Sequence, residues 1–175
     1  MRKPLVTRRC LLSQPTHSDH PALRRLFANE QTRMFLGGKQ SPEAIETRCA
    51  RVVAEAGVYH AVVRSSRTNE FLGLLSLAPY HQGDDMEVSY EFLPEYWGQG
   101  YAEEALKAFL PFAMQELNLT SLLAETQLQN TRSIRLLQKL GMQQTRQLER
   151  FGEQQVVYRL DLSATGCGWV FSAAC

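Results

Sequence analysis

The sequence predicts a single domain of mixed α/β class, with a central, mostly antiparallel twisted sheet of about seven strands and helices on both faces. Three observations support this class. Stretches in which apolar and polar residues alternate, as in 86–92, are interspersed with stretches of helical periodicity, as in 101–117. The order strand, helix, strand over 86–126 implies that the fourth and fifth strands pair in parallel through a right-handed crossover. The length of 175 residues suits one domain with a sizeable core.

The N-terminal third is predicted to hold one strand and two helices. Residues 5–12 form the strand, which ends before a proline. Ser18 or Asp19 can cap the first helix, and Pro21 suits its first turn, where a missing N–H is harmless. The run Ser-Pro-Glu at 41–43 provides a cap, a first-turn proline and an early carboxylate for the second helix.

Two hairpins complete the predicted sheet. Residues 59–64 and 71–79 are strands on either side of a polar turn, and 143–150 and 153–162 flank a Phe-Gly turn. Between these hairpins lie the strand at 86–92, the long helix that follows it, and a short buried strand before the last helix.

The end of the chain differs from the rest in composition. We expect the domain to span residues 1–162, because glycines and small residues surround the few aromatic side chains of 163–175. This tail either docks on the surface, is disordered, or is foreign to the domain, and the sequence leaves all three open.

Composition and charge exclude several classes of protein. The net charge of +1 gives no electrostatic basis for a nucleic-acid or membrane partner. No run approaches the ~20 apolar residues of a membrane helix. The four cysteines, at positions 10, 49, 167 and 175, form no Cys-x-x-Cys pair, and the four histidines are scattered, so no metal site is expected. Scattered cysteines suit a reduced, cytoplasmic protein.

The stretch from the fourth strand into the long helix carries the strongest functional signal. The strand ends at Pro94, and Gly98 and Gly100 precede a helix that begins at Tyr101. Free first-turn amides and the helix dipole favour an anion there, and glycine lets a phosphate approach the backbone. Glu103 stands where a dinucleotide fingerprint needs its third glycine, and no Gly-Lys-Ser/Thr follows. A phosphate cradle remains, with a plain tight turn as the alternative.

These residues carry a family resemblance. The segment 96–105, Tyr-Trp-Gly-Gln-Gly-Tyr-Ala-Glu-Glu-Ala, is similar to the acetyl-CoA loop of the GNAT superfamily of N-acetyltransferases, usually Gln/Arg-x-x-Gly-x-Gly/Ala. Gly100 and Ala102 fill its last two positions, and Trp97 replaces the usual Gln or Arg. Its Trp-Gly-Gln-Gly form resembles the branch that acetylates N-termini of ribosomal proteins. Residues 130–142 resemble the family's Asn-x-x-Ser helix, with methionine at 142 where phenylalanine is usual.

The resemblance implies acetyl-CoA as co-substrate. It implies that loop amides bind the CoA pyrophosphate, and that the fourth and fifth strands splay so that the end of the fourth strand holds the pantetheine arm. The implied cofactor-binding residues are Phe92, Leu93, Trp97, Gly98, Gln99, Gly100, Tyr101, Ala102 and Asn130. Asn130 also needs no explanation beyond capping its helix, and both roles can hold.

Acetyl transfer to an amine needs a base and a way to release the thiolate. Glu87 is the candidate base, on the strand face opposite Val88 and Tyr90; Glu91 shares that face, and water is a further option. Glu87 could equally be a solvated strand residue or bind the substrate cation. Ser133, one turn from the helix cap, could donate a proton or a hydrogen bond to sulfur. Relatives often have tyrosine where this chain has Leu137, which leaves Ser133 or water.

The predicted function is therefore an acetyl-CoA-dependent N-acetyltransferase. The resemblance favours a protein N-terminal α-amine as acceptor, with a small amine such as a polyamine, amino acid or aminoglycoside as the rival. A non-catalytic acyl-CoA-binding module is the alternative from another class. The acceptor pocket would come from the first two helices and the final hairpin, in a monomer or a homodimer. No nucleophile motif such as Gly-x-Ser-x-Gly is present.

Overall fold

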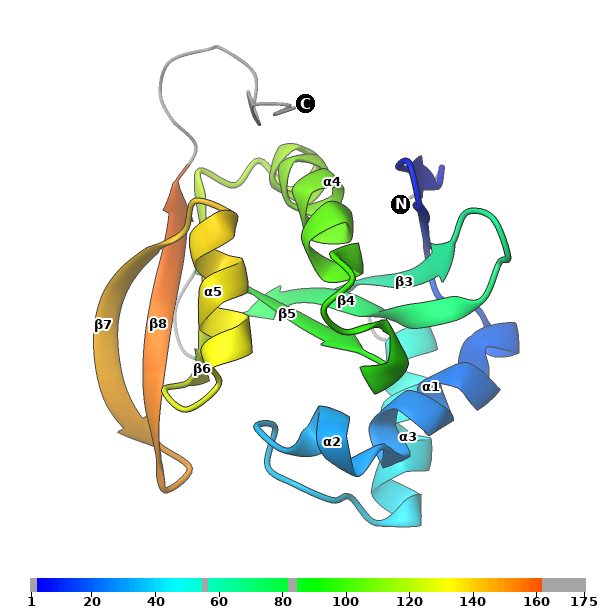
Figure 1. The fold of residues 1–175 in the computed structure, drawn as a ribbon, viewed down its shortest axis with the longest axis horizontal. Helices are drawn as coiled ribbons and strands as arrows, with labels where there is room; N and C mark the ends of the chain where they lie inside the picture. The colour runs from blue at the N-terminus through cyan, green and yellow to red at the C-terminus, as the bar shows by residue number, and fades with distance from the viewer. Residues whose placement is uncertain (1–2, 55–56, 82–84, 162–175) are drawn as a thin grey trace.

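The computed structural model describes residues 3–54, 57–81 and 85–161, which form a mixed α/β domain around an eight-stranded sheet (Figure 1). The tail 163–175 and the predicted boundary at 162 lie outside the described residues. The strands are β1 (Leu5–Val6), β2 (Cys10–Ser13), β3 (Tyr59–Ser65), β4 (Phe71–Pro79), β5 (Met86–Phe92), β6 (Ser121–Gln127), β7 (Gln143–Arg150) and β8 (Glu153–Asp161).

Sheet order is β1-β2-β3-β4-β5-β6-β8-β7. The β5–β6 pair is parallel and the other neighbouring pairs are antiparallel, so the predicted fold class is confirmed. The helices are α1 (His20–Ala28), α2 (Glu30–Arg33), α3 (Pro42–Ala54), α4 (Tyr101–Glu116) and α5 (Thr131–Lys139), with short 3-10 turns at His17–Asp19 and Pro94–Tyr96. Within the described ranges, none of the helices is long and apolar enough to cross a membrane.

The stretch 5–12, predicted as one strand, instead folds into a hairpin of β1 and β2. Leu5 pairs with Leu12, and the turn is closed by the Thr7 N–H, which donates to the Cys10 carbonyl at 2.8 Å. The carboxylate of Glu104 in α4 accepts from the Thr7 hydroxyl at 2.6 Å and from the Arg9 N–H at 2.7 Å. This contact from a distant helix holds the turn, which is why the strand pattern alone did not reveal it.

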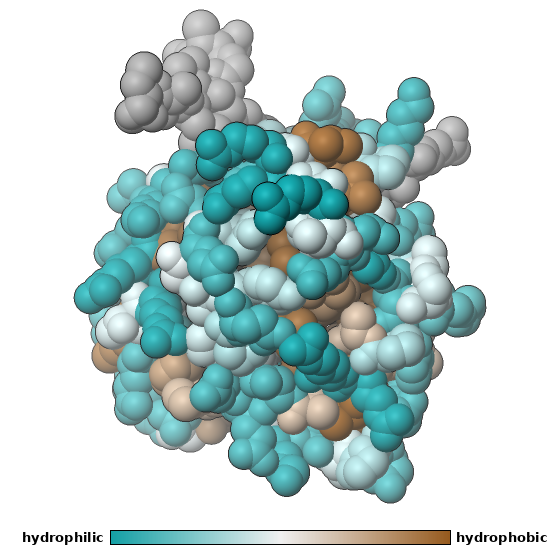
Figure 2. Space-filling view, turned by 45° about the vertical axis from the view of Figure 1, so that its right-hand side comes forward, coloured by the Kyte–Doolittle hydropathy of each residue, from teal (hydrophilic) through white to brown (hydrophobic). Residues whose placement is uncertain are grey.

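Two clusters of buried side chains hold helices on opposite faces of the sheet. On one face, Leu106 and Phe109 of α4 pack against the apolar side of the central strands. On the other face, Leu26 and Phe27 of α1 meet Cys49 of α3. Figure 1 shows α1, α2 and α3 gathered beside β3–β5, whereas β6, β8 and β7 extend away from them. The surface seen in Figure 2 is mostly hydrophilic, with hydrophobic patches between polar side chains.

One glycine lets β4 and β5 come unusually close together. A Cβ added to Gly73 would lie 2.3 Å from the Glu91 carbonyl oxygen and 2.8 Å from the Phe92 ring. Because the nearest atom is backbone, a larger residue could not be accommodated by a side-chain rotation. Gly73 therefore fixes how the end of β5 lies across β4, just before the glycine loop.

Candidate active site

The two parallel strands part soon after they begin. Among the described residues, β5 and β6 are registered at a single pair, Glu87 with Leu123, whereas β5 remains paired with β4 along its whole length. Both strands run in the same direction from this pair, so the gap between them widens toward the glycine loop. Backbone groups of β5 that face this gap lack a sheet partner there, which makes them available to a ligand.

The glycine loop leads directly into α4. Gly98 and Gly100 have left-handed φ values of 72° and 79°, and Gly100 is the N-cap residue of the helix. A Cβ on Gly98 would meet no atom within 4 Å, so backbone conformation rather than crowding calls for glycine there. The Glu104 N–H donates to the Gly100 carbonyl at 3.0 Å, and the first-turn amides before it have no helical partner. The predicted strand, glycine turn and helix start are confirmed, and their geometry suits an anion.

Arg9 of the N-terminal hairpin braces this loop, a role that the sequence did not suggest. Its guanidinium donates to the Glu104 carboxylate at 2.7 Å and to the Gln99 carbonyl at 2.9 Å, and lies 4.7 Å from the centre of the Tyr101 ring. The hydrogen bond to Glu104 is the main cause of the raised pKa of Arg9. Only the folded chain brings these residues together, because some 90 positions separate Arg9 from the loop.

Trp97 closes the end of β5. Its indole N–H donates to the Phe92 carbonyl at 2.7 Å, and the Leu93 N–H donates to the Leu72 carbonyl at 3.0 Å. These two backbone groups at the predicted pantetheine site are therefore bonded within the protein. The guanidinium of Arg132, at the start of α5, lies 5.2 Å from the Trp97 ring and adds a cation beside the loop.

The start of α5 faces β5 across the gap. Asn130 caps the helix as predicted, because its side-chain oxygen accepts the Ser133 N–H at 3.2 Å. The Ser133 hydroxyl lies 2.6 Å from the Tyr90 hydroxyl, and Leu137 is buried. Burial raises the pKa of Tyr90 to about 12, so this phenol stays neutral at physiological pH. Tyr90 was missed because its place in the strand pattern indicated only a core position.

Glu87 lies at the closed end of the gap, on the sheet face opposite α4. Burial is the main cause of a Glu87 pKa raised to about 7, and the negative charge of Glu125 acts in the same direction. A backbone hydrogen bond from Glu125 and the charge of Arg150 oppose this shift. A carboxyl group with such a pKa exchanges a proton near neutral pH, as a general base must.

The other two carboxylates on this face are held by arginines. Glu91, with a side chain 6% exposed, pairs with Arg48 and lies 3.9 Å from Arg33. Glu125, with a side chain 7% exposed, accepts from Arg150 at 2.9 Å. The geometry thus separates Glu87 from Glu91, which sequence reasoning placed on one face as successive candidates. In the part of the chain that the structure describes, no group of three or more His, Cys, Asp or Glu could hold a metal ion.

A glycine loop at a helix N-terminus, beside two parting parallel strands, is the arrangement of an acetyl-CoA-dependent acetyltransferase. Comparison with known protein families agrees, since the family described as an acetyltransferase (GNAT) domain matches residues 9–143. The chain therefore belongs to the GNAT acetyltransferases.

Relatives and solved structures fit this assignment. The chain is 28% identical to the uncharacterized N-acetyltransferase YoaA of Bacillus subtilis over 84% of this chain and 86% of YoaA. It is 32% identical to the B. subtilis protein YkkB over 58% of this chain, a match that spans 60% of YkkB.

Two solved structures share the fold. Ribosomal-protein-S5-alanine acetyltransferase from Vibrio fischeri has a TM-score of 0.77 at 16% identity, covering 92% of this chain and 97% of that one. Spermidine N-acetyltransferase from Vibrio cholerae, in complex with CoA and spermine, has a TM-score of 0.75 at 17% identity, covering 87% and 95%. At these identities the likeness concerns the fold alone.

We expect Gly100→Glu to weaken CoA binding by roughly 100-fold or more, because like charges brought together cost several kcal/mol. Calorimetric titration with CoA measures the effect. Gly100→Ala is the matched control, since it carries the same strain at φ +79° without the charge. Unchanged CoA affinity in a folded Gly100→Glu protein contradicts the assignment of this loop.

Proposed function

We propose that this acetyltransferase transfers the acetyl group of acetyl-CoA to the α-amine at the N-terminus of a protein. The observation that carries the proposal is one ionisable carboxylate, Glu87, that has no arginine within ion-pair distance in the described structure, whereas Glu91 and Glu125 on the same face are each paired with arginine. A single carboxylate suits an acceptor with a single reactive ammonium group. The Trp-Gly-Gln-Gly loop, which resembles that of the branch acting on ribosomal-protein N-termini, supports the same acceptor.

The charges argue against a polyamine. A chain of several ammonium groups needs several carboxylates without cationic partners, as the opposite charge stabilises the bound cation. Glu91 and Glu125 are each bound to arginine, and a polyamine would have to displace those guanidinium groups. This chain therefore shares the fold of spermidine N-acetyltransferase. The carboxylates on this face of the chain are not arranged to bind several ammonium groups.

Residues around the gap fit CoA. In the proposed complex, first-turn amides of α4 and the loop 97–102 hold the pyrophosphate, with Arg132 as a nearby cation. Asn130 and the free backbone edge of β5 hold the pantetheine arm. Because the Phe92 carbonyl and Leu93 N–H are already bonded, these two residues would contact the arm through other groups. Bound acetyl-CoA supplies an activated thioester carbonyl.

Glu87 is proposed to take a proton from the acceptor ammonium. A protein N-terminus has a pKa of about 7.7–8.0, close enough to the Glu87 pKa of about 7 for proton transfer with a small cost. Once neutral, the amine nitrogen has the lone pair needed to attack the thioester. Water between the two groups would serve equally well.

The Tyr90–Ser133 pair is proposed to stabilise the departing sulfur. A thiol has a pKa of about 8.5, far below the Tyr90 pKa of about 12, so complete proton transfer from tyrosine to thiolate is unfavourable. A hydrogen bond to the thiolate, with Tyr90 polarising the Ser133 hydroxyl, fits these values better. This arrangement provides hydroxyl donors despite leucine at 137.

An acceptor panel tests the proposed function. We expect thiol release from acetyl-CoA with peptides that have a free N-terminus, and little with their N-formylated forms, with spermidine or with an aminoglycoside. Mass spectrometry then identifies the acetylated nitrogen. Turnover with a small amine alone contradicts the proposal.

Glu87→Gln should lower kcat by about 10²- to 10⁴-fold near neutral pH while CoA affinity is kept. In the wild type, kcat should rise with pH through about 7, because Glu87 must lose its proton before it can accept one. The variant should lack this rise, and its defect should shrink at high pH, where the amine is already neutral. Glu116→Gln, an exposed glutamate at the end of α4, is the control. A loss under about threefold would move the role to water.

Ser133→Ala and Tyr90→Phe should each lower kcat by about tenfold to a hundredfold, with little change in the acetyl-CoA KM. The double variant should have the same kcat as Ser133→Ala alone, because Tyr90 acts through the Ser133 hydroxyl. Tyr59→Phe on β3 controls for loss of a phenol elsewhere. Full kcat in both single variants would leave Ser133 as an ordinary helix residue.

A further inference from the structure

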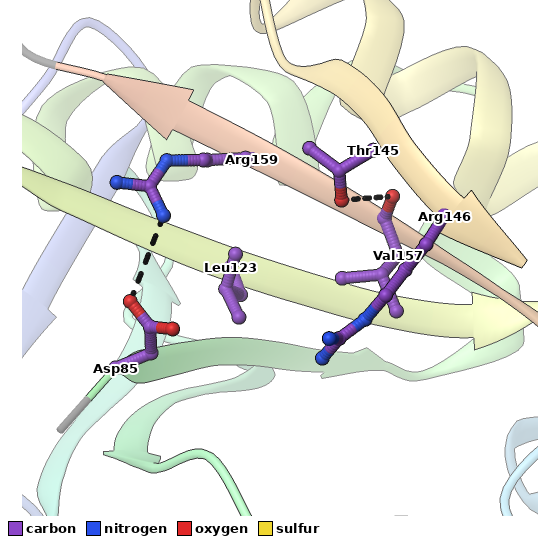
Figure 3. Close-up of a pocket in the computed structure, with 6 residues that line it drawn as sticks. All are labelled: Asp85, Leu123, Thr145, Arg146, Val157 and Arg159. Carbon is purple, nitrogen blue, oxygen red and sulfur yellow. Dashed lines mark hydrogen bonds and ion pairs between the residues drawn. The ribbon is translucent and has the colours of Figure 1, made fainter. Parts of the chain in front are cut away.

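A pocket lies on the sheet face that carries Glu87, and Figure 3 shows the six residues that line it. It is lined by Asp85, Leu123, Thr145, Arg146, Val157 and Arg159, and its volume is about 180 Å³. Pockets for whole drug-sized ligands have volumes of roughly 300–1,000 Å³, so this smaller pocket suits one functional group of a larger molecule. Leu123 belongs both to the pocket and to the pair that it forms with Glu87. The pocket is therefore a direct neighbour of the candidate base.

The polar groups of the pocket favour an anion. Arg159 is balanced by Asp161 at 2.7 Å and Asp85 at 3.7 Å, and the Thr145 hydroxyl donates to the Val157 carbonyl at 3.2 Å. Arg146 is different: no carboxylate of the described residues forms an ion pair with it.

Arg146 is an exposed residue whose guanidinium lies over the Tyr80 ring. Figure 3 shows its side chain extending from β7 across Val157, over the face of the sheet. Its guanidinium lies 5.5 Å from the centre of the Tyr80 ring. Tyr80 donates in turn to Glu125, which Arg150 also binds. The planar guanidinium of arginine has donors that match the two oxygens of a carboxylate or phosphate.

The distance from Glu87 indicates which anion fits. Arg146 lies on β7, which is three strand spacings from β5, about 14 Å, and its side chain extends across Val157 of the intervening β8. An extended peptide advances about 3.3 Å per residue. The carboxylate of a free amino acid is too near its own amine to span this gap, whereas a side chain two residues along the peptide can do so.

We propose that Arg146 and this pocket bind a carboxylate side chain on the second or third residue of the acceptor polypeptide. This inference rests on the proposed N-terminal acetylation and adds a sequence preference to it. In this proposal the apolar side chains of Leu123 and Val157 contact the methylene groups of aspartate or glutamate, and Arg146 binds the carboxylate oxygens.

Matched peptides test the preference. Peptides that begin Ala-Glu-Ala or Ala-Ala-Glu should have a kcat/KM about tenfold higher than the same peptides with glutamine, in line with one charge-assisted contact. Arg146→Gln should remove this preference and leave kcat/KM for the glutamine peptides unchanged. Arg146→Lys should retain part of it. Arg67→Gln, in the exposed β3–β4 turn, is the control.

The outcomes separate the two proposals. Acetylation of all peptides at equal kcat/KM overturns the inference and leaves the proposed function standing, whereas no acetylation of any peptide removes the function itself. A preference for acidic peptides that survives Arg146→Gln also overturns the inference. Inorganic phosphate is added as a competitor: phosphate that inhibits acidic and glutamine peptides alike through Arg146 would mark a free-anion site instead.

Discussion

The site depends on the place where β5 parts from β6. A single registered pair, Glu87 with Leu123, joins the two strands. The strands differ in their surroundings on the two sides of this pair. At the closed end, the strands partly bury Glu87 and bring it near Glu125. Toward the open end, β5 presents an edge without a neighbour and leads into the glycine loop. One constraint on backbone pairing therefore creates both a perturbed carboxylate and a path for an extended cofactor.

Arginine placement then sets the charges of the proposed acceptor face. Arg48 and Arg33 hold Glu91, and Arg150 holds Glu125, so these carboxylates complete ion pairs in a partly buried environment. Removing one partner of such a pair is costly, which keeps the pairs in place. The charge of Glu87 is left to respond to substrate. Arg146 provides the opposite charge on the far side of the same face.

The loop and the N-terminal hairpin support each other. Glu104 of α4 accepts from Thr7 and Arg9, while Arg9 reaches the Gln99 carbonyl in the loop. The same contacts that fold 5–12 into a hairpin also limit the motion of the proposed phosphate cradle. An amide cradle binds well only if its donors are already oriented, since ordering them on binding lowers affinity.

The sequence by itself determined the strand–glycine–helix unit, the Asn130 cap and most element bounds, because these depend on residues a few positions apart. It also placed Glu87 and Glu91 on one face. Only the tertiary structure gave them different surroundings, by bringing Arg48 to Glu91, 43 positions away. It likewise joined Tyr90 to Ser133 and Arg9 to Glu104, across 43 and 95 positions. Strand order and helix packing set such contacts and the solvent exclusion that shifts a pKa, and no local pattern encodes them.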